Sequence, residues 1–394
     1  MLVPALKTEN KTPQTSARAG RYVHQPEGYR AFIPAALPPT PPVRINAEIQ
    51  TALSDADRAL GRLDGSIRTL PNPDLFVFMY VRKEAVLSSQ IEGTQSSLDD
   101  LLEVEAALFR HNRPKDVDEV VNYVAAMNHG LGRLKTLPLS VRLIREIHEK
   151  LLKDVRGANR RPGELRGSQN WIGPHGCTLN EALYVPPPPH EVPKALGDLE
   201  AFLRAHDSMP ALVRVGLVHA QFETIHPFLD GNGRVGRLLI TFMLCEREIM
   251  TKPVLYLSHY FKHHRERYYE LLQAVRDRDD WESWLFFFLT AVAKVSNEAT
   301  ETARKIVDLR ERHRDTITQR FGRAAAGALR VLESLYHRPI ISVNDIKDET
   351  KTSYTAANNL TDRFVNCGIL HEITGHARNR LFRYSDYVDI FADR

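Results

Sequence analysis

Apolar residues recur at helical spacing over most of this 394-residue chain. The pattern begins near Asn46 and places Ala52, Ala56, Leu60 and Leu63 on one side of a predicted amphipathic helix. The same periodicity predicts further helices at residues 75–92, 97–111, 117–134, 140–152, 193–206, 211–224 and 260–275. The chain is therefore expected to be mainly α-helical.

Polar and proline-rich stretches interrupt this pattern. Residues 1–21 are polar and irregular and are expected to be mobile. Residues 35–42 are rich in proline, which predicts a stiff, extended strap across the surface. Residues 162–173 and 178–185 hold short apolar runs between turn residues, and the prolines at 186–189 end the second run because they cannot donate to a β-ladder. These runs predict a β-hairpin with one edge open to an extended peptide, or a surface hairpin without a partner.

The last part of the chain predicts a separate domain. The charged residues 296–320 are expected to form a connector helix. Beyond them the pattern predicts helices at residues 325–336, 343–350 and 353–367, and a β-ribbon around Gly375 within residues 369–384. This order is typical of a winged helix-turn-helix, which we assign to residues 321–394.

Charge indicates what such a domain contacts. Residues 320–394 hold eleven Lys and Arg against nine Asp and Glu, and the third helix offers Arg363 beside Asp362. Domains that bind DNA are usually more basic. Contacts with protein, including a homodimer, are therefore favoured over DNA, which stays an alternative.

Composition is that of an ordinary globular protein, with 43% hydrophobic and 26% charged residues. A net charge of +4 gives no general affinity for polyanions. The three scattered cysteines, Cys177, Cys245 and Cys367, favour a reducing compartment over a disulfide framework. No apolar signal segment is evident, and the longest apolar run, residues 284–295, is too short to span a bilayer. We expect a cytoplasmic protein that does not insert into a membrane.

Residues 226–237, HPFLDGNGRVGR, concentrate groups suited to nucleotide transfer. Gly231, Asn232 and Gly233 precede an apolar run that is expected to be a buried helix, so their N–H groups can converge on a phosphate. Arg234 and Arg237 are three apart and share a helix face from which both can reach that anion.

Two further groups flank this predicted phosphate site. Asp230 is a hard oxygen ligand of the kind that Mg²⁺ requires, and His226 is placed to accept a hydroxyl proton. Alone, a Gly-Asn-Gly turn, a pair of arginines or a histidine is ordinary. Together within twelve residues they predict a site for phosphate chemistry.

This stretch resembles the signature of the Fic family, His-Pro-Phe-x-[Asp/Glu]-Gly-Asn-Gly-Arg-x-x-Arg, at every fixed position. Family members mostly transfer AMP from ATP to a protein hydroxyl. The resemblance implies His226 as the base and Asp230 as the ligand of Mg²⁺. It implies that ATP contacts Asp230, Gly231, Asn232, Gly233, Arg234, Gly236, Arg237, His264 and Tyr268, with the α-phosphate at Asn232 and Gly233 and the outer phosphates at the two arginines.

A second motif ends the 75–92 helix, where Ser88, Glu92 and Gly93 match the family's inhibitory pattern, [Ser/Thr]-x-x-x-Glu-[Gly/Asn]. By local physics alone, Glu92 is disfavoured by the helix dipole and would be a solvent-screened carboxylate. The resemblance implies instead that residues 75–93 form an inhibitory helix whose Glu92 pairs with Arg237.

Two smaller features are interpreted beside the motif. The resemblance implies a flap, residues 178–189, that docks the target through Ala182, Leu183 and Tyr184. It also places Tyr268 and its neighbour Tyr269 near the adenine, although aromatic residues that only pack between helices would give the same pattern.

His148, His259 and His263 lie outside the motif and are not interpreted as metal ligands. His148 lies on the apolar side of its predicted helix and is read as a core or capping residue. His259 and His263 are four apart, as in some metal sites, but no carboxylate or cysteine is spaced to complete a zinc site.

The expected organisation is a Fic-type helical bundle with a small flap, followed by the winged helix. The predicted divisions are residues 1–21, 22–135 with the inhibitory helix, 136–295 with the catalytic core, 296–320 and 321–394. The expected activity is transfer of AMP from Mg²⁺-ATP to a Ser, Thr or Tyr hydroxyl of a target protein. The alternatives are removal of AMP at the same site, with Glu92 orienting water, and a nucleotide-responsive DNA-binding regulator.

Overall fold

The computed structural model describes residues 18–68, 70, 72–106, 114, 116–174, 176–376 and 378–392. The helices are α1 (Ala47–Arg68), α2 (Asp74–Ile91), α3 (Leu98–Glu105), α4 (Val117–Arg133), α5 (Val141–Leu151), α6 (Val192–Arg204), α7 (Ala211–Ile225), α8 (Asn232–Glu246), α9 (Ser258–His263), α10 (Arg265–Arg278), α11 (Trp281–Arg320), α12 (Ala325–Leu335), α13 (Val343–Thr350), α14 (Tyr354–Asn366) and α15 (Ser385–Val388). The predicted mainly helical class is confirmed. No helix among these described residues is both long and apolar enough to cross a membrane.

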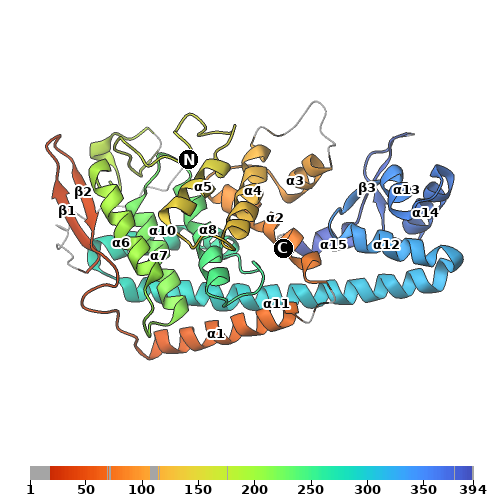
Figure 1. Cartoon of the computed structure of the whole chain (residues 1–394), viewed down its shortest axis with the longest axis horizontal. Coiled ribbons are helices and arrows are strands. Elements are labelled where there is room, and N and C mark those ends of the chain that lie inside the picture. Colours follow the sequence, from red (N-terminus) through yellow and green to blue (C-terminus); the bar gives the residue numbers. More distant parts are fainter. Residues whose placement is uncertain are drawn as a thin grey trace.

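The molecule is elongated because α11 runs from the helical body on one side to a separate unit on the other (Figure 1). Its 40 residues give a length of about 60 Å at 1.5 Å per residue. The predicted boundary between residues 295 and 296 is wrong. Val295, Ala299, Ala303 and Ile306 continue the buried stripe without a break, so one helix serves both the core and the connector. Helix α1 lies along α11 on the lower side in Figure 1.

Helices α7 and α8 form the centre of the body, with α2, α4 and α5 beside α8 (Figure 1). Every residue of α7 from Leu212 to Ile225 is buried, as expected of a helix in the middle of a core. Residues 226–237 connect α7 to α8 and form the first turns of α8. They are thus held by packed structure on both sides.

Two predicted helices have different bounds. The expected 260–275 helix is divided at His264 into α9 and α10, because the backbone leaves the helical region there, with φ −112° and ψ 37°. The 97–111 helix is described as α3 only to Glu105, and residues 107–113 lie outside the described residues.

The described N-terminal segment is ordered from residue 18 onward, which corrects the prediction of irregular chain to residue 21. Strands β1 (Gly20–His24) and β2 (Arg30–Pro34) form an antiparallel hairpin in which Tyr22 pairs with Phe32. Arg18 donates to Glu282 on α11, and the aromatic pair packs edge to face. Long-range contacts of this kind were not visible in the local pattern. Residues 1–17 lie outside the described residues.

The predicted flap hairpin is reduced to a single bridge, between Ile172 and Tyr184. Between them the chain forms a short 3₁₀ helix, η1 (Leu179–Glu181), and not a second strand. Glycines at 173 and 176 and a proline at 174 explain why no ladder extends from the bridge. The residue after Tyr184, Val185, accepts a hydrogen bond through its carbonyl from the Phe32 N–H of β2.

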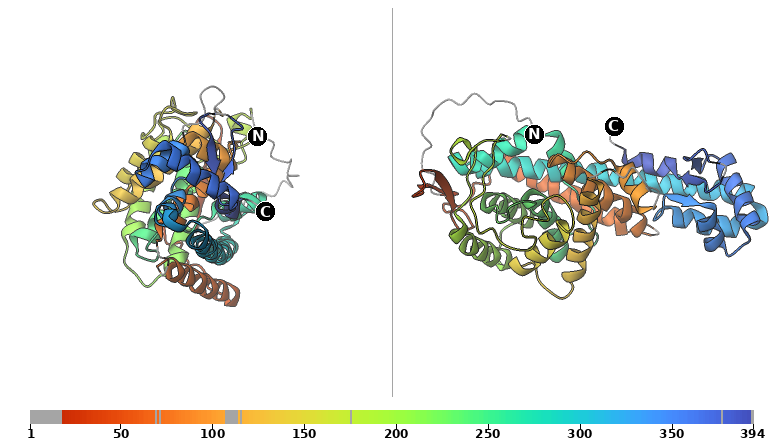
Figure 2. Two further views of the ribbon diagram at one scale, coloured as in Figure 1. Left: turned by 90° about the vertical axis from the view of Figure 1, so that its right-hand side faces the viewer. Right: turned by 90° about the horizontal axis from the view of Figure 1, so that it is seen from above.

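The unit beyond α11, residues 322–392, is called the C-terminal unit below, and it extends from one end of the molecule (Figure 2). It contains α12, α13 and α14 and an antiparallel sheet of β3 (Ile340–Ser342), β5 (Leu381–Arg383) and β4 (His371–Glu372), in that order. The three helices and the ribbon follow the predicted order. Its assignment as a winged helix remains a prediction.

Candidate active site

The motif loop connects α7 to α8 and is closed by its own backbone and side chains. His226 ends α7 and Gly231 precedes α8, both with left-handed φ, at 49° and 78°. Asn232 then accepts a hydrogen bond from the Phe228 N–H at 2.9 Å and donates to the Phe228 carbonyl at 2.8 Å. Asn232 therefore shapes the loop in addition to starting the helix whose N–H groups face outward from it.

His148 supports this loop from α5. Its ring stacks on Phe228 with centroids 3.7 Å apart, and Nε2 lies 3.0 Å from the Asp230 carbonyl. The Gly163 N–H donates to Nδ1, so Nε2 carries the proton of a neutral ring. Burial lowers the pKa of His148 to about 4, which keeps it neutral. The interpretation as a core histidine agrees with this geometry.

The His226 imidazole is also held neutral. Burial is the main cause and the Arg166 and Arg276 guanidinium groups add to it, so the pKa of His226 is lowered to about 3. Arg166 also donates to the His226 carbonyl at 2.9 Å, and Asn170 donates to the Phe228 carbonyl at 2.8 Å. A neutral, positioned imidazole is able to accept a proton.

Arg234 is fully buried in the first turn of α8. It donates from one terminal nitrogen to Glu119 of α4 at 3.0 Å, and its other terminal nitrogen is 3.7 Å from Asp230. Its Nε and that second nitrogen have no hydrogen-bond partner among the described residues. Such open donors on a buried cation are suited to an anion.

Glu119 was missed in the sequence, although it could have been noticed there. It lies on the buried side of α4 with Val120 and Tyr123, where an unpaired carboxylate would be costly. Its two partners are Arg234 and the exposed Arg156, at 3.0 and 3.2 Å. An acidic residue in an apolar stripe therefore indicates a cationic partner, but the sequence alone does not identify that partner.

Arg237 forms hydrogen bonds with residues at the end of α2. One of them is Glu92, whose pairing with Arg237 the inhibitory motif predicted. Nε donates to the Ser88 hydroxyl at 2.8 Å, and one terminal nitrogen donates to the Ser88 carbonyl at 3.0 Å and to Glu92 Oε1 at 2.8 Å. Burial alone would raise the pKa of the Glu92 carboxyl, but Arg237 outweighs it and the pKa is lowered. Gly93 follows with φ 99°, a conformation that favours glycine.

The Glu92 carboxylate also lies against the first turn of α8. A methyl group at Gly233 would overlap with Glu92 Oε1, so this oxygen occupies the space directly over that residue. Gly233 belongs to the α-phosphate cradle that the sequence predicts, so Glu92 pairs with Arg237 and also lies over that predicted cradle.

Two more buried carboxylates lie behind Arg237. Glu84, on α2, accepts hydrogen bonds from the hydroxyls of Tyr123 and Ser258. Glu223, on α7, lies behind Gly236, where an added methyl group would meet it. Burial raises the pKa of each carboxyl to about 7. Gly236 therefore faces the protein interior, and its contribution is close helix packing.

Asp230 is the oxygen ligand that the motif offers. Its Oδ1 accepts a hydrogen bond from the Gly231 N–H at 2.6 Å, and 37% of its side chain is exposed. Within the described part of the chain, no group of three His, Cys, Asp or Glu residues could hold a metal by itself. One open carboxylate fits Mg²⁺ that arrives with the phosphates of its nucleotide.

The aromatic residues predicted near the adenine differ in exposure. Tyr268 is buried, and its hydroxyl lies 2.8 Å from His219 Nε2, whose Nδ1 is 2.9 Å from the Gly236 carbonyl. It thus supports α8 from inside. Tyr269 is 40% exposed. Partial burial raises the pKa of its hydroxyl, and the charge of the Glu92 carboxylate raises this pKa further. His264 is exposed and packs on Tyr260, at 4.3 Å between ring centroids.

The flap residues also divide into buried and exposed. Tyr184 is buried, donates from its hydroxyl to the Thr224 carbonyl, and lies under the Arg276 guanidinium at 3.8 Å. Leu183 and Trp171, the neighbours of the two bridged residues, are 50% and 42% exposed. Ala182 is half-buried. Tyr184 therefore anchors the flap, whereas Leu183 is available to a partner.

Comparison with known proteins finds two family matches in this chain, "Fic/DOC family N-terminal" over residues 50–132 and "Fic/DOC family" over residues 138–244. A probable protein adenylyltransferase of Aquifex aeolicus is 29% identical over 175 residues, which cover 44% of this chain and 51% of that protein. The protein adenylyltransferase Fic of Culex quinquefasciatus is 29% identical over 189 residues, which cover 47% of this chain and 34% of that protein. The chain thus spans about half or less of the length of these curated relatives.

One solved structure is similar over most of the chain. The crystal structure of a Fic family protein from Desulfovibrio desulfuricans aligns with a TM-score of 0.58 at 21% identity. The alignment covers 87% of this chain and 97% of that protein. At this identity the similarity concerns the fold, and it agrees with the predicted helical bundle.

Proposed function

The chain belongs to the Fic/DOC family, and from that premise we propose that it transfers AMP from Mg²⁺-ATP to a Ser, Thr or Tyr hydroxyl of a protein. Both relatives named above are called protein adenylyltransferases, which supports nucleotidyl transfer. The observation that carries the proposal is the buried Arg234, whose Nε and one terminal nitrogen have no hydrogen-bond partner among the described residues. A buried cation with open donors beside helix N–H groups is suited to a phosphate chain.

In the proposed reaction, the neutral His226 imidazole takes the proton of the target hydroxyl. The hydroxyl oxygen forms a bond to the α-phosphorus while the bond from that phosphorus to the bridging β-oxygen breaks. Pyrophosphate leaves, held by Arg234 and Arg237. The N–H groups of Asn232 and Gly233 stabilise the negative charge on the α-phosphate oxygens during transfer.

Asp230 is the residue proposed to hold Mg²⁺. Its exposure and its hard oxygen fit the ion, and no other ligand from the protein is required if the phosphates complete the coordination. When bound, Mg²⁺ would neutralise phosphate charge. One terminal nitrogen of Arg234 lies 3.7 Å from Asp230. The guanidinium group and the carboxylate that would hold Mg²⁺ therefore lie side by side.

The nucleotide base and the target are proposed to lie on either side of this centre. The base is assigned to the partly exposed Tyr269 in preference to the buried Tyr268, and the exposed His264 borders the same α9–α10 junction. The target is assigned to the flap, where Leu183 and Trp171 present apolar side chains to an extended segment.

The reverse reaction, removal of AMP from a modified protein, is the second candidate. The observation that favours it is the proximity of Glu92 to His226, since each contributes to the pKa of the other. A carboxylate beside the base could orient water on a phosphodiester. Incubation with a protein that already carries AMP separates this candidate from transfer.

The C-terminal unit is proposed to be a winged helix that contacts protein. Contact with DNA is the less favoured alternative, because the charges of this unit are nearly balanced. Dimerisation through it is one form of such contact. The three cysteines are free, which supports a reducing, cytoplasmic location.

The proposal is tested by incubating a cell lysate with this protein, ATP and Mg²⁺ and searching peptides by mass spectrometry for an added AMP group. We expect AMP on Ser, Thr or Tyr side chains, and on this protein itself. A matched incubation with the His226→Ala variant is expected to give none. An absence of added AMP with the Glu92→Gly variant as well would overturn the proposal.

Glu119→Gln is expected to lower the rate of AMP transfer about fivefold, because a neutral amide holds the Arg234 guanidinium less firmly and small displacements at a reacting centre are costly. The maximal rate should fall, whereas KM for ATP should stay equal or fall, since a competing negative charge is removed. Steady-state kinetics at varied ATP give both quantities.

Arg156→Ala is the matched control for this prediction, because Arg156 pairs with the same carboxylate but is 56% exposed. It should leave both quantities nearly unchanged. A faster Glu119→Gln variant would show that Glu119 restrains Arg234 in an inactive position, contrary to the proposed support.

A further inference from the structure

Helix α2 presents two separate stripes of residues. Glu84, Ser88 and Glu92 recur four apart and face the Arg237 side, where Glu84 is held by Tyr123 and Ser258. A second stripe, at the i, i+3, i+4, i+7 spacing of one helix face, consists of Lys83, Val86, Leu87 and Gln90 and lines a cavity. The first stripe belongs to the site already described, whereas the second lines a cavity outside that site.

Residues at the end of the C-terminal unit, among them Arg383, Val388 and Phe391, line the same cavity as the second stripe. The 3₁₀ helix η4 (Asp389–Phe391) contacts α2. Phe391 is 2% exposed and its ring meets Tyr80 of α2 edge-on, with centroids 5.6 Å apart. His337 approaches Phe78 of α2 in the same manner, at 5.9 Å.

An ion pair adds a polar contact between the same two parts of the molecule. Arg383 of β5 donates to Asp99 in the first turn of α3, at 3.0 Å, and also to Asp389 at 2.9 Å. Because α3 follows directly after the α2 stop at Gly93, this pair lies close to the end of α2 that carries Glu92. The C-terminal unit therefore contacts both the start and the end of the inhibitory helix region.

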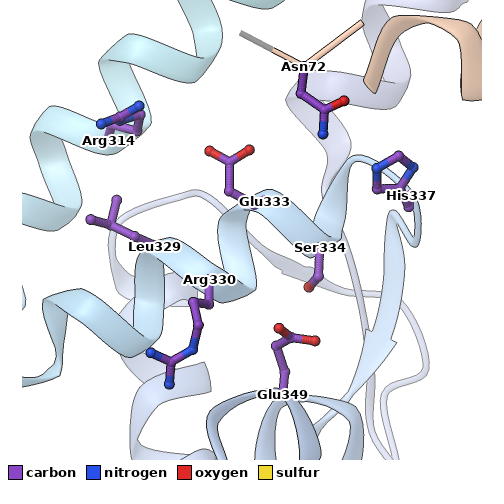
Figure 3. Close-up of a pocket in the computed structure, with 8 residues that line it drawn as sticks. All are labelled: Asn72, Arg314, Leu329, Arg330, Glu333, Ser334, His337 and Glu349. Atoms are coloured by element: carbon purple, nitrogen blue, oxygen red, sulfur yellow. The ribbon is translucent and has the colours of Figure 1, made fainter. Parts of the chain in front are cut away.

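The interface between these parts is less completely packed than a core. An open hollow of about 460 Å³ lies along α12, and Asn72, two residues before α2, faces Glu333 and His337 across it (Figure 3). A second cavity, of about 210 Å³, lies between α2, α3 and Arg383. Side chains that border voids lose contacts on one side, so this interface opens at lower cost than the core around α7.

We propose that the C-terminal unit is a clamp that holds α2 in the position where Glu92 pairs with Arg237. This proposal rests on the AMP transfer proposed above and on the inhibitory role that the Ser88, Glu92 and Gly93 motif implies. Because α2 is one continuous helix, loosening the contacts on one stripe weakens docking of the other. The closed state, with Glu92 on Arg237, and an open state then exchange, and contacts at Phe391 and Arg383 bias this equilibrium toward closure.

Phe391→Ala in the full chain is expected to raise AMP transfer roughly threefold to thirtyfold, the range that a change in coupling between distant sites can produce. In a Glu92→Gly background the same substitution should leave the rate within about twofold, because both substitutions act through the contact between Glu92 and Arg237 and their effects do not add once that contact is absent. Amide hydrogen exchange across residues 84–92 should become faster in Phe391→Ala without any nucleotide.

Arg383→Ala and Arg338→Ala provide a matched pair within the same unit. Arg383 reaches α3, whereas Arg338 pairs at 2.8 Å with Asp345 inside the C-terminal unit. Arg383→Ala should raise both transfer and exchange and Arg338→Ala neither, which keeps the test valid if Phe391→Ala unfolds the unit. Unchanged exchange across residues 84–92 in Arg383→Ala, or an equal rise in rate with and without Glu92, would overturn the clamp. If no variant transfers AMP, the proposed function fails and exchange still decides the clamp.

Discussion

His226→Ala is expected to lower the rate of AMP transfer by about 10²–10⁴, the usual contribution of a general base, while ATP binding stays nearly intact. The reason is that only the imidazole is lost. The loop contacts of His226 run through its backbone, whose carbonyl accepts from Arg166 and whose N–H donates to Phe222. Initial rates on a fixed protein substrate, calorimetry of ATP binding and thermal melting measure the three quantities.

One structural feature calls for a second variant beside alanine. His226 has φ 49°, a conformation in which asparagine is tolerated better than most residues. His226→Asn should therefore fold with less strain than His226→Ala and be equally slow, which separates loss of the base from distortion of the loop. Transfer within tenfold of the wild-type rate in either variant would remove His226 from its proposed role.

Glu92→Gly is expected to raise AMP transfer at least about tenfold, most visibly as modification of the protein itself, because a displacement of about 1 Å at a reacting centre can cost a hundredfold. Two contacts of Glu92 would be relieved together. Its ion pair with Arg237 at 2.8 Å takes the cation that the γ-phosphate needs. Its position over Gly233 fills part of the phosphate cradle.

Two companions make the Glu92 result specific. Glu92→Gln keeps the size of the side chain but not its charge, so it should recover part of the increase. Arg237→Ala should remain slow even when combined with Glu92→Gly, because the same arginine serves the phosphates. The rates of these four variants and of the wild type at saturating Mg²⁺-ATP are compared. An unchanged or lower rate in Glu92→Gly would assign Glu92 to the reverse reaction or to a screened surface carboxylate.

Local patterns predicted the elements that depend on neighbouring residues. Helical periodicity predicted α2, α4, α5, α6 and α7 to within one or two residues at each end, because the apolar residues of each segment recur at helical spacing. Where a feature depended on distant packing, prediction failed. The β1–β2 hairpin was not predicted, and the flap, predicted as a β-hairpin, has a single β-bridge. The predicted connector helix began at residue 296, whereas the buried stripe of α11 continues through Val295 and Ala299.

Among the site residues, the sequence by itself determined the chemistry that we propose for residues 226–237, because the predicted phosphate cradle, its arginines and its base lie within one loop and one helical turn. Only the tertiary structure decided the partners of the two arginines. Glu119 is 115 positions from Arg234, and Glu92 is 145 positions from Arg237. Tertiary packing also decided that Tyr268 is buried and that the C-terminal unit meets α2. The physical reason is that burial makes a charge depend on its nearest counter-charge, and folding, not local spacing, brings that counter-charge close.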